Sequence, residues 1–305
     1  MTAIKTALIG AGYLGQFHGQ KLLELEKAGH LEFTGVFDQK NENAKQACEK
    51  WGGKKVFSTV GELCKNNAAV VISASTPAHF ALAKQCLELG LHVNVEKPIC
   101  EKVSEAREII NIAQSKKLIL TVGHSERFNP AYKFLREKFI KPTHVEFRRL
   151  NPFKDRSLEV SVVHDLMIHD LDLFFTWDRS GVKDFVSDGG SVVSQQLDWA
   201  SAILKMNSGM SASFKVSRVS PHVDRSITIN SEKAQGYVNL VNLECHICEG
   251  TAAPVKTQLE KADHLLLENL EFVQAIKNKR APLISADDGF QALVWTEKII
   301  QKIKD

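Results

Sequence analysis

The chain has 305 residues, which predicts about two domains at roughly 100–200 residues per domain. Hydrophobic residues make up 44% and charged residues 25%, which is typical of a soluble globular protein and excludes a disordered, collagen-like or small disulfide-rich chain. Lys and Arg number 39 and Asp and Glu 36, so the net charge of +3 favours neither nucleic acid nor an anionic membrane as a partner.

The sequence predicts a cytoplasmic protein with reduced thiols. No stretch approaches the roughly 18 consecutive apolar residues of a membrane span, and Gly10 breaks the N-terminal apolar stretch too early for a signal peptide. Four of the six cysteines are scattered singly, which is typical of intracellular chains. Cys245 and Cys248 form a lone CxxC, and without a second pair we expect two incidental thiols and no metal site.

The first part of the chain alternates short apolar runs with helical patterns. Because continuous apolar strands separated by helices are typical of a parallel sheet covered on both faces, we expect an α/β domain over residues 1–122. The expected strands cover residues 6–9, 31–37, 68–74, 92–95 and 118–122, and the expected helices cover 14–28, 43–49, 78–89 and 104–115.

The pattern changes after Gly123, and residues 123–305 are expected to form a second domain. Stretches of alternating polar and apolar residues predict an antiparallel sheet with one covered face. Helices are expected at 130–138, 162–177, 263–279 and 287–304, and strands at 144–149, 182–187, 191–196, 200–206, 210–216 and 226–230.

A GxGxxG motif, Gly10-Ala11-Gly12-Tyr13-Leu14-Gly15, follows the first expected strand and opens the first expected helix. In this context the motif predicts a dinucleotide site, because Gly10 permits the tight turn, Gly12 lets the backbone approach a pyrophosphate and Gly15 lets the helix pack closely. The free N–H groups of the helix N-terminus then face the phosphates. The alternative is a glycine-rich turn with no ligand.

Asp38 ends the second expected strand, about where a carboxylate that binds the cofactor ribose belongs. Such a carboxylate accepts hydrogen bonds from a 2′-hydroxyl and repels a 2′-phosphate. We therefore expect NAD in preference to NADP, although Lys40 lies close by in the sequence. The alternative interpretation makes Asp38 a turn residue at a strand end.

Lys97 follows the fourth expected strand, in the sequence Val93-Asn94-Val95-Glu96-Lys97-Pro98. Ligands of open parallel sheets bind at the carboxyl ends of the strands, so Lys97 is expected to face the nicotinamide end of the cofactor. There its ammonium group can donate to a substrate hydroxyl or carbonyl oxygen. A solvated lysine at a strand end is the alternative.

The expected helix 162–177 carries Asp165, His169 and Asp172 among mostly apolar residues. Asp165 and His169 are four residues apart, and Asp172 continues their face of the helix. Burying such groups costs free energy unless they are paired, so their presence on a mostly apolar helix indicates a structural or functional role. A histidine base oriented by a carboxylate is one such role, and a purely structural Asp–His pair is the alternative.

Together these motifs resemble the Gfo/Idh/MocA oxidoreductases. The resemblance rests on the GxGxxG loop, the acidic end of the second strand, and the segments Ser75-Thr76-Pro77-Ala78-His79, Glu96-Lys97-Pro98 and Asp165-xxx-His169. It implies an N-terminal Rossmann domain with a doubly wound parallel sheet. It also implies a C-terminal α+β domain with an open, mostly antiparallel sheet, through which a homo-oligomer such as a dimer or tetramer forms.

The resemblance also implies roles for individual residues. His169 is the general base that takes a proton from a sugar hydroxyl, Lys97 holds and polarises that oxygen, and Asp165 belongs to the same catalytic set. Ser75, Thr76, Pro77, His79, Glu96 and Lys97 join the glycine loop and Asp38 in binding the cofactor. Many members have a glycine between the aspartate and the histidine, whereas residues 166–168 here are Leu-Met-Ile.

A narrower resemblance is to the short family members that oxidise the 3-hydroxyl of UDP-N-acetylglucosamine, whose product a transaminase converts for lipid A. It rests on the sequence at 123–130, 149–153 and 165–170. The implied substrate-binding residues are His124, Arg127, Asn129, Arg149 and Asp172, and the two arginines suit a diphosphate because guanidinium grips phosphate oxygens bidentately.

Three alternatives to a nucleotide-sugar dehydrogenase remain open at this point. The first is a dehydrogenase of a free sugar or inositol, which does not need Arg127 and Arg149 beside its site. The second is a regulatory protein that binds the cofactor without turnover, because fold does not determine function. The third is a reductase of a non-sugar substrate, which the paired Asp and His disfavour.

Overall fold

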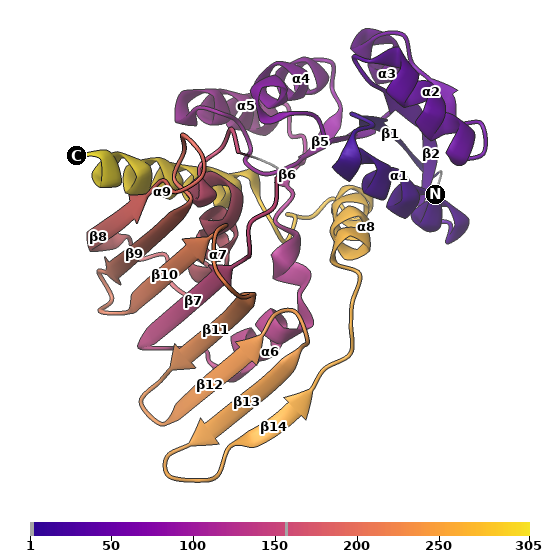
Figure 1. The fold of residues 1–305 in the computed structure, drawn as a ribbon. Coiled ribbons are helices and arrows are strands. Elements are labelled where there is room, and N and C mark those ends of the chain that lie inside the picture. The colour runs from indigo at the N-terminus through magenta and orange to yellow at the C-terminus, as the bar shows by residue number, and fades with distance from the viewer. Residues whose placement is uncertain (1–2, 156–157) are drawn as a thin grey trace. The chain divides into compact units, whose positions relative to one another are not determined.

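The computed structural model describes residues 3–155 and 158–305 (Figure 1). Its helices and strands divide into two compact units, Met1–Ser125 with Asp263–Phe290, and Glu126–Ala262 with Gln291–Asp305. The first unit thus includes a C-terminal segment, 263–290, that the sequence pattern leaves in the second domain. Among the described residues, none of the helices combines the length and apolar character that crossing a bilayer requires.

The first unit is built around a parallel sheet with the strand order β3-β2-β1-β4-β5-β6. This order is that of a Rossmann fold, which confirms the predicted fold class. Its strands are β1 (Ile4–Ile9), β2 (Leu31–Phe37), β3 (Lys55–Val56), β4 (Ala69–Ile72), β5 (His92–Val95) and β6 (Leu120–Val122). Its helices are α1 (Tyr13–Lys27), α2 (Asn41–Lys50), α3 (Val60–Asn66), α4 (Thr76–Glu88), α5 (Val103–Ser115) and α8 (His264–Lys277).

Helix α8 packs against α1, far from it in sequence (Figure 1). Phe272 and Val273 of α8 are buried in one apolar cluster with Leu22 and Leu25 of α1. The Asp263 side chain caps the helix by accepting a hydrogen bond from Leu266 N at 2.9 Å. This packing is what joins residues 263–290 to the N-terminal unit.

The second unit has a mostly antiparallel sheet with the order β14-β13-β12-β11-β7-β10-β9-β8, in which the β7–β10 pair is parallel. This confirms the predicted mostly antiparallel second sheet. Its strands are β7 (His144–Leu150), β8 (Val182–Gly190), β9 (Trp199–Met206), β10 (Ser211–Ser217), β11 (Asp224–Asn230), β12 (Ala234–Asn239), β13 (Glu244–Glu249) and β14 (Val255–Gln258). Its helices are α6 (Pro130–Lys138), α7 (Ile168–Phe174) and most of α9 (Ala286–Lys304), and a short 3-10 turn spans Ser125–Phe128.

Helices α6, α7 and α9 lie on one face of this sheet (Figure 1). Phe174 of α7 makes an edge-to-face contact with Phe214 of β10, and Phe214 stacks on Phe147 of β7 with the ring centroids 5.1 Å apart. Ile299 of α9 belongs to the same buried cluster. The other face carries polar or exposed residues such as Lys215, so the strands alternate as expected of a sheet with one covered face.

The strand predicted at residues 191–196 is wrong, because this segment is a loop. The carboxylate of Asp198 accepts hydrogen bonds from the backbone N–H groups of Val192, Val193 and Ser194 at 2.6, 2.7 and 3.0 Å. These donors therefore cannot take part in a strand ladder.

The Cys245–Cys248 pair lies on β13. Residues three apart on a strand point to opposite faces, so the two thiols do not face one another. All six cysteines are free.

Candidate active site

The glycine loop follows β1 and leaves no room for side chains at two of its glycines. Gly10 has a φ of +95°, and a Cβ there would lie 2.5 Å from the Ser73 carbonyl oxygen. A Cβ on Gly15 would lie 2.1 Å from the carbonyl oxygen of Gly10. Only glycine therefore fits at either position, as the dinucleotide motif requires.

Gly12 has a different surrounding, because nothing lies within 4 Å of the position its Cβ would take. It precedes α1 without a side-chain cap, and the next residue, Tyr13, is 76% exposed, with Leu14 exposed beside it. The first N–H groups of α1 thus border an open space. These residues fit the pyrophosphate of a dinucleotide.

Asp38 is tied to this loop. Its Oδ2 accepts a hydrogen bond from Ala11 N at 2.7 Å, and its Oδ1 accepts one from Lys40 N at 2.7 Å. A carboxylate offers about four acceptor positions, so both oxygens have capacity for a further donor such as a ribose hydroxyl. The predicted ribose-binding residue therefore lies beside the glycine loop.

A second segment of cofactor candidates lies at the start of α4, after β4. Ser75 and Pro77 are exposed and Thr76 is half-buried at the N-terminus of that helix. His79 is buried, with its Nδ1 2.8 Å from the Pro98 carbonyl oxygen and its Nε2 3.0 Å from the Ala74 carbonyl oxygen. Burial lowers the pKa of His79. Its contacts are thus to the backbone, and they link α4 to the turn after Lys97.

Lys97 and Glu96 follow β5, where the Lys97–Pro98 peptide bond is cis. Lys97 is half-buried, whereas the Glu96 side chain is buried and accepts a hydrogen bond from Lys97 N at 3.2 Å. A Cβ on Gly123 would lie 2.9 Å from the Glu96 carboxylate, so this glycine makes room for it. Glu96, predicted to bind the cofactor, therefore turns its carboxylate into the fold.

The carboxylate of Glu96 belongs to a buried cluster that the sequence reasoning missed. The Nε2 atom of His18, on α1, lies 2.7 Å from the Glu96 carboxylate. The Nδ1 atom of His18 lies 3.1 Å from Asn269 Nδ2. Beside them, Asn94 Nδ2 donates a hydrogen bond to the Glu268 carboxylate at 3.1 Å. Ligand atoms of His18, Glu96 and Glu268 lie within 4.8 Å of one another. Such a spacing suits a metal ion, and the 2.7 Å separation of His18 Nε2 and Glu96 Oε1 also suits a direct hydrogen bond between them. His18, a polar residue on the buried face of α1, was the sequence feature that could have indicated this cluster.

The charges in this cluster follow from burial and pairing. Burial disfavours the charged imidazolium, but the hydrogen bond and charge of Glu96 outweigh it and raise the pKa of His18. Against the effect of burial, His18 likewise lowers the pKa of Glu96. Burial and the charge of Glu96 raise the pKa of Glu268 to about 8. The shifts of His18 and Glu96 thus favour the charged form of each, whereas that of Glu268 favours its neutral form.

In the second unit, Asp165 and His169 lie where the helix changes its geometry. A π turn spans Val163–Met167 and is followed by α7, so the continuous helix predicted over 162–177 is divided. Asp165 is in the wide turn, His169 is in the first turn of α7, and both are half-buried. Single π turns inside α-helices are frequent at functional sites.

The arginines predicted to bind diphosphate are both held in buried ion pairs of the second unit. Arg127 is 6% exposed and contacts Asp172 through Nε at 2.7 Å and Nη2 at 2.6 Å. Arg149 is 3% exposed and contacts Asp170 at 2.7 Å and Glu126 at 3.2 Å. Carboxylates thus occupy both guanidinium groups, and a phosphate would have to displace them.

The remaining substrate candidates are also buried. Asn129 caps α6, because its Oδ1 accepts a hydrogen bond from Ala131 N at 3.0 Å, and its Nδ2 donates to the Leu240 carbonyl at 3.1 Å. His124, in the first unit, is fully buried and its backbone N–H donates to the Val122 carbonyl at 2.8 Å. The contacts of Asn129 are thus those of a structural residue.

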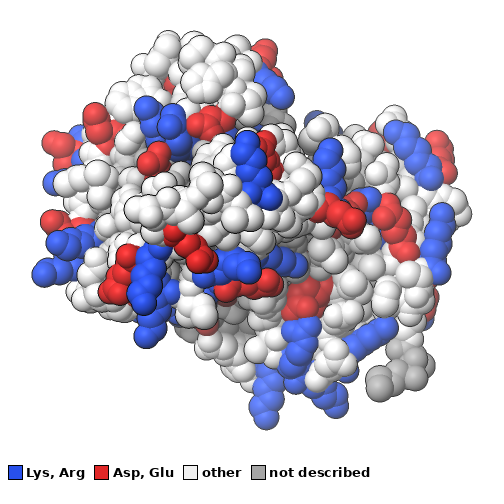
Figure 2. Space-filling view, turned by 90° about the horizontal axis from the view of Figure 1, so that it is seen from below, with Lys and Arg blue, Asp and Glu red and all other residues white. Residues whose placement is uncertain are grey.

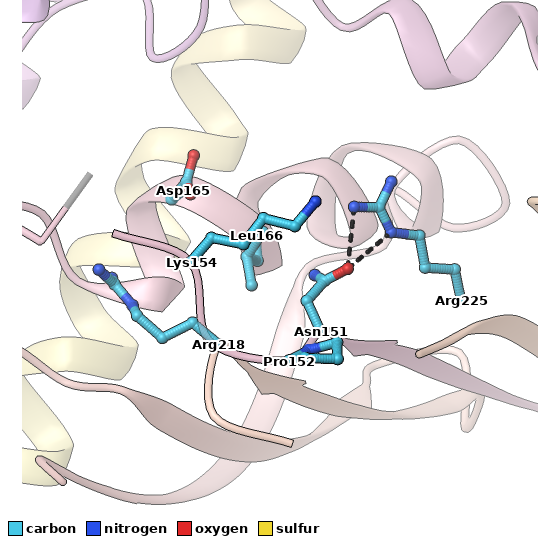
Figure 3. A pocket seen from close by; sticks show the side chains of 7 residues that line it. All are labelled: Asn151, Pro152, Lys154, Asp165, Leu166, Arg218 and Arg225. Atoms are coloured by element: carbon cyan, nitrogen blue, oxygen red, sulfur yellow. Dashed lines mark hydrogen bonds between the residues drawn. The ribbon is translucent and has the colours of Figure 1, made fainter. Parts of the chain in front are cut away.

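A pocket in the second unit includes Asp165 in its lining (Figure 3). The basic side chains around it were not predicted from the sequence. The lining comprises Asn151, Pro152, Lys154, Asp165, Leu166, Arg218 and Arg225. Elsewhere, basic and acidic side chains are interspersed over the face in Figure 2, as the nearly equal totals of 39 and 36 lead one to expect.

Known proteins share this fold. A model of the oxidoreductase family with an NAD-binding Rossmann fold matches residues 4–124. The UDP-N-acetylglucosamine 3-dehydrogenase of Acidithiobacillus ferrooxidans is 33% identical over 290 residues, which cover 92% of this chain and 91% of that protein. The chain belongs to the Gfo/Idh/MocA oxidoreductase family. It is therefore a dehydrogenase whose first unit binds a nicotinamide cofactor.

Two further comparisons show how far the likeness to other family members extends. A solved structure of the A. ferrooxidans enzyme has a TM-score of 0.94 and 31% identity, with 100% of this chain and 99% of that chain covered. The myo-inositol 2-dehydrogenase of Thermotoga maritima is 24% identical over 315 residues, which cover 95% of this chain and 93% of that protein. The family likeness thus spans both units.

Proposed function

We propose that this protein oxidises the 3-hydroxyl of UDP-N-acetylglucosamine to a ketone, with NAD as the oxidant. The observation that carries the proposal is the likeness, over nearly the whole of both chains, to a dehydrogenase of that substrate. The presence of Lys97, Asp165 and His169 at the positions of the family's catalytic set supports it further. The ketone product is of the kind that a transaminase aminates in lipid A precursor synthesis.

Three side chains act on the sugar in this proposal. The ammonium of Lys97 donates a hydrogen bond to the reacting oxygen and stabilises the negative charge that develops on it. His169 accepts the hydroxyl proton, and Asp165 orients the imidazole and stabilises it once protonated. Bound NAD would supply the acceptor for the hydride of the carbinol carbon, so the alcohol loses one hydride, which carries two electrons, and one proton, which His169 takes up.

Asp38 supports NAD over NADP in this proposal. Its carboxylate lies at the glycine loop, where it accepts a hydrogen bond from Ala11 N at 2.7 Å. A 2′-phosphate placed there would meet a negative charge, whereas a 2′-hydroxyl would donate a hydrogen bond to it.

We also propose that the protein forms a homo-oligomer through the open face of the second sheet. Among the described residues, the helices of the second unit lie on one face of its sheet, and the other face presents half-buried and exposed side chains of β7, β9 and β10. Light scattering on the purified protein tests this proposal. A dimer or tetramer is expected, and a monomer at micromolar concentration would contradict it.

The proposed activity is tested by the absorbance of reduced nicotinamide with purified protein, NAD and UDP-N-acetylglucosamine. Semicarbazide is added to trap the ketone, since alcohol oxidation by NAD can be unfavourable. We expect turnover that requires the nucleotide sugar and is lost in His169→Ala. Turnover of free sugars or inositols, with none of UDP-N-acetylglucosamine, would reject the proposed substrate.

A further inference from the structure

The pocket that contains Asp165 is rich in positive charge. Its lining has three basic side chains, Lys154, Arg218 and Arg225, and one acidic side chain, Asp165 (Figure 3). Lys154 is exposed and Arg225 is half-buried. A concave site with more cations than anions attracts a negatively charged ligand more strongly than a flat surface does.

Asn151 positions one of these cations. Its Oδ1 accepts hydrogen bonds from Arg225 Nε at 3.2 Å and Nη2 at 3.0 Å, which orients the guanidinium group. In Figure 3 the side chains of Lys154 and Arg225 point toward one another above Asn151. Like charges that approach one another repel, and an anion bound between them replaces that repulsion by attraction.

The third cation, Arg218, is held more firmly. Its guanidinium lies 3.6 Å from the Asp198 carboxylate and donates to the Val160 carbonyl. Arg218 is 8% exposed. Its main contribution is therefore positive charge in the wall of the pocket, and direct contact with a ligand is secondary. The neighbouring cation Arg148 is paired with Asp224 at 2.9 Å.

We propose that Lys154 and Arg225 form the subsite for the diphosphate of the nucleotide sugar, with Arg218 adding positive charge to the wall. This inference rests on the proposed function and replaces Arg127 and Arg149 in the diphosphate-binding role, because those arginines are buried against carboxylates. A diphosphate carries charge that a free sugar lacks. The subsite therefore makes the enzyme specific for nucleotide-linked sugars.

The position of Asp165 supports the same inference. It lines the pocket and stands four residues before His169, the proposed base. A diphosphate held by Lys154 and Arg225 is thus bound beside the residues that act on the attached sugar ring.

Calorimetric titration of UDP into the full-length protein, with NAD saturating its own site, tests the subsite. We expect Lys154→Gln and Arg225→Gln each to weaken UDP binding by roughly 10–100-fold, the size of one charge-assisted hydrogen bond. Lys138→Gln is the matched control, since Lys138 is an exposed lysine of α6 outside the pocket lining. Wild-type affinity should fall as the salt concentration rises.

UDP affinity that is unchanged in both pocket variants would overturn the subsite. Because Lys154 is exposed, Lys154→Gln is expected to fold normally, and an unchanged dissociation constant for NAD checks this for both variants. The KM for UDP-N-acetylglucosamine should rise with the dissociation constant for UDP. If the variants lose UDP binding while wild-type enzyme does not oxidise UDP-N-acetylglucosamine, the subsite stands and the proposed substrate fails. If oxidation proceeds with an unaltered KM in both variants, the subsite fails and the proposed function stands.

Discussion

Replacing Glu268 by Gln should make the protein more stable at alkaline pH. Glu268 is buried, and its side chain keeps a proton at neutral pH because burial and the charge of Glu96 raise its pKa to about 8 from an ordinary value of 4.5. The unfolded chain releases that proton more readily, so between these two values the folded state binds more protons and stability falls as pH rises. Gln keeps an oxygen that can accept the hydrogen bond from Asn94 and has no proton to lose.

The size of the effect follows from the two pKa values of Glu268. Each pKa unit corresponds to about 1.4 kcal/mol, so the wild type should lose about 3 kcal/mol of unfolding free energy between pH 5 and pH 8 through this group. The variant keeps His18 and Glu96, so its difference from wild type reports the ionisation of Glu268 together with the charge interactions of Glu268 with those two groups. The stability advantage of Glu268→Gln over wild type should therefore grow by about this amount across the range.

Urea denaturation of the cofactor-free protein, followed by circular dichroism at pH 5, 6, 7 and 8, measures this difference. Glu49→Gln is the matched control, because Glu49 is an exposed residue of α2, and it should follow the wild type at each pH. A difference between Glu268→Gln and wild type that stays constant from pH 5 to pH 8 would refute the reasoning.

Four further substitutions test the proposed site and the ion pair that supports it. Lys97→Ala or His169→Ala should lower kcat by roughly 10²–10⁴-fold, and retained turnover would remove that residue from the chemical step. His169→Ala should leave the dissociation constant for NAD unchanged. Asp38→Ala should narrow the ratio of kcat/KM for NAD to that for NADP, and an unchanged ratio would count against its contact with the ribose. Asp172→Asn should cost about 3–5 kcal/mol in urea unfolding, because it leaves the buried guanidinium of Arg127 without its counter-charge. A loss below about 1 kcal/mol would show that the pair matters little.

The Rossmann sheet and its glycine loop could be predicted because their signals are local. The glycines at 10, 12 and 15 stand between an apolar strand and a helix, and the loop they form depends on contacts within the motif and with the neighbouring strand end at Ser73. Asp38 could be located because its distance in sequence from the loop is set by one helix and one strand. These features are read from spacing.

The second sheet was harder to predict, because its outer strands carry weak patterns. Strands Ala234–Asn239, Glu244–Glu249 and Val255–Gln258 were not expected, since they mix polar and exposed residues. Residues 191–196 alternate as a strand does, but the Asp198 carboxylate takes up their N–H groups. The alternation of polar and apolar residues does not reveal that a side chain outside the segment will bind the backbone N–H groups that a strand would need.

The environment of the charged residues was the least predictable feature. Arg127 pairs with Asp172, 45 residues away, and Arg149 pairs with Asp170, 21 residues away, so neither partner follows from local spacing. The π turn at Val163–Met167 is likewise hidden, because its mix of apolar and polar residues suits either helix geometry. Such contacts depend on how the second unit packs.

The most direct test of the proposed reaction follows the hydride. UDP-N-acetylglucosamine carrying deuterium at C3 of the sugar is incubated with the enzyme and NAD, and the reduced cofactor is analysed by mass spectrometry. The proposed function predicts one deuterium atom in the reduced nicotinamide, and His169→Ala should form this deuterated cofactor roughly 10²–10⁴-fold more slowly. Reduced cofactor without deuterium, or no reduction while free sugars are oxidised, would contradict it.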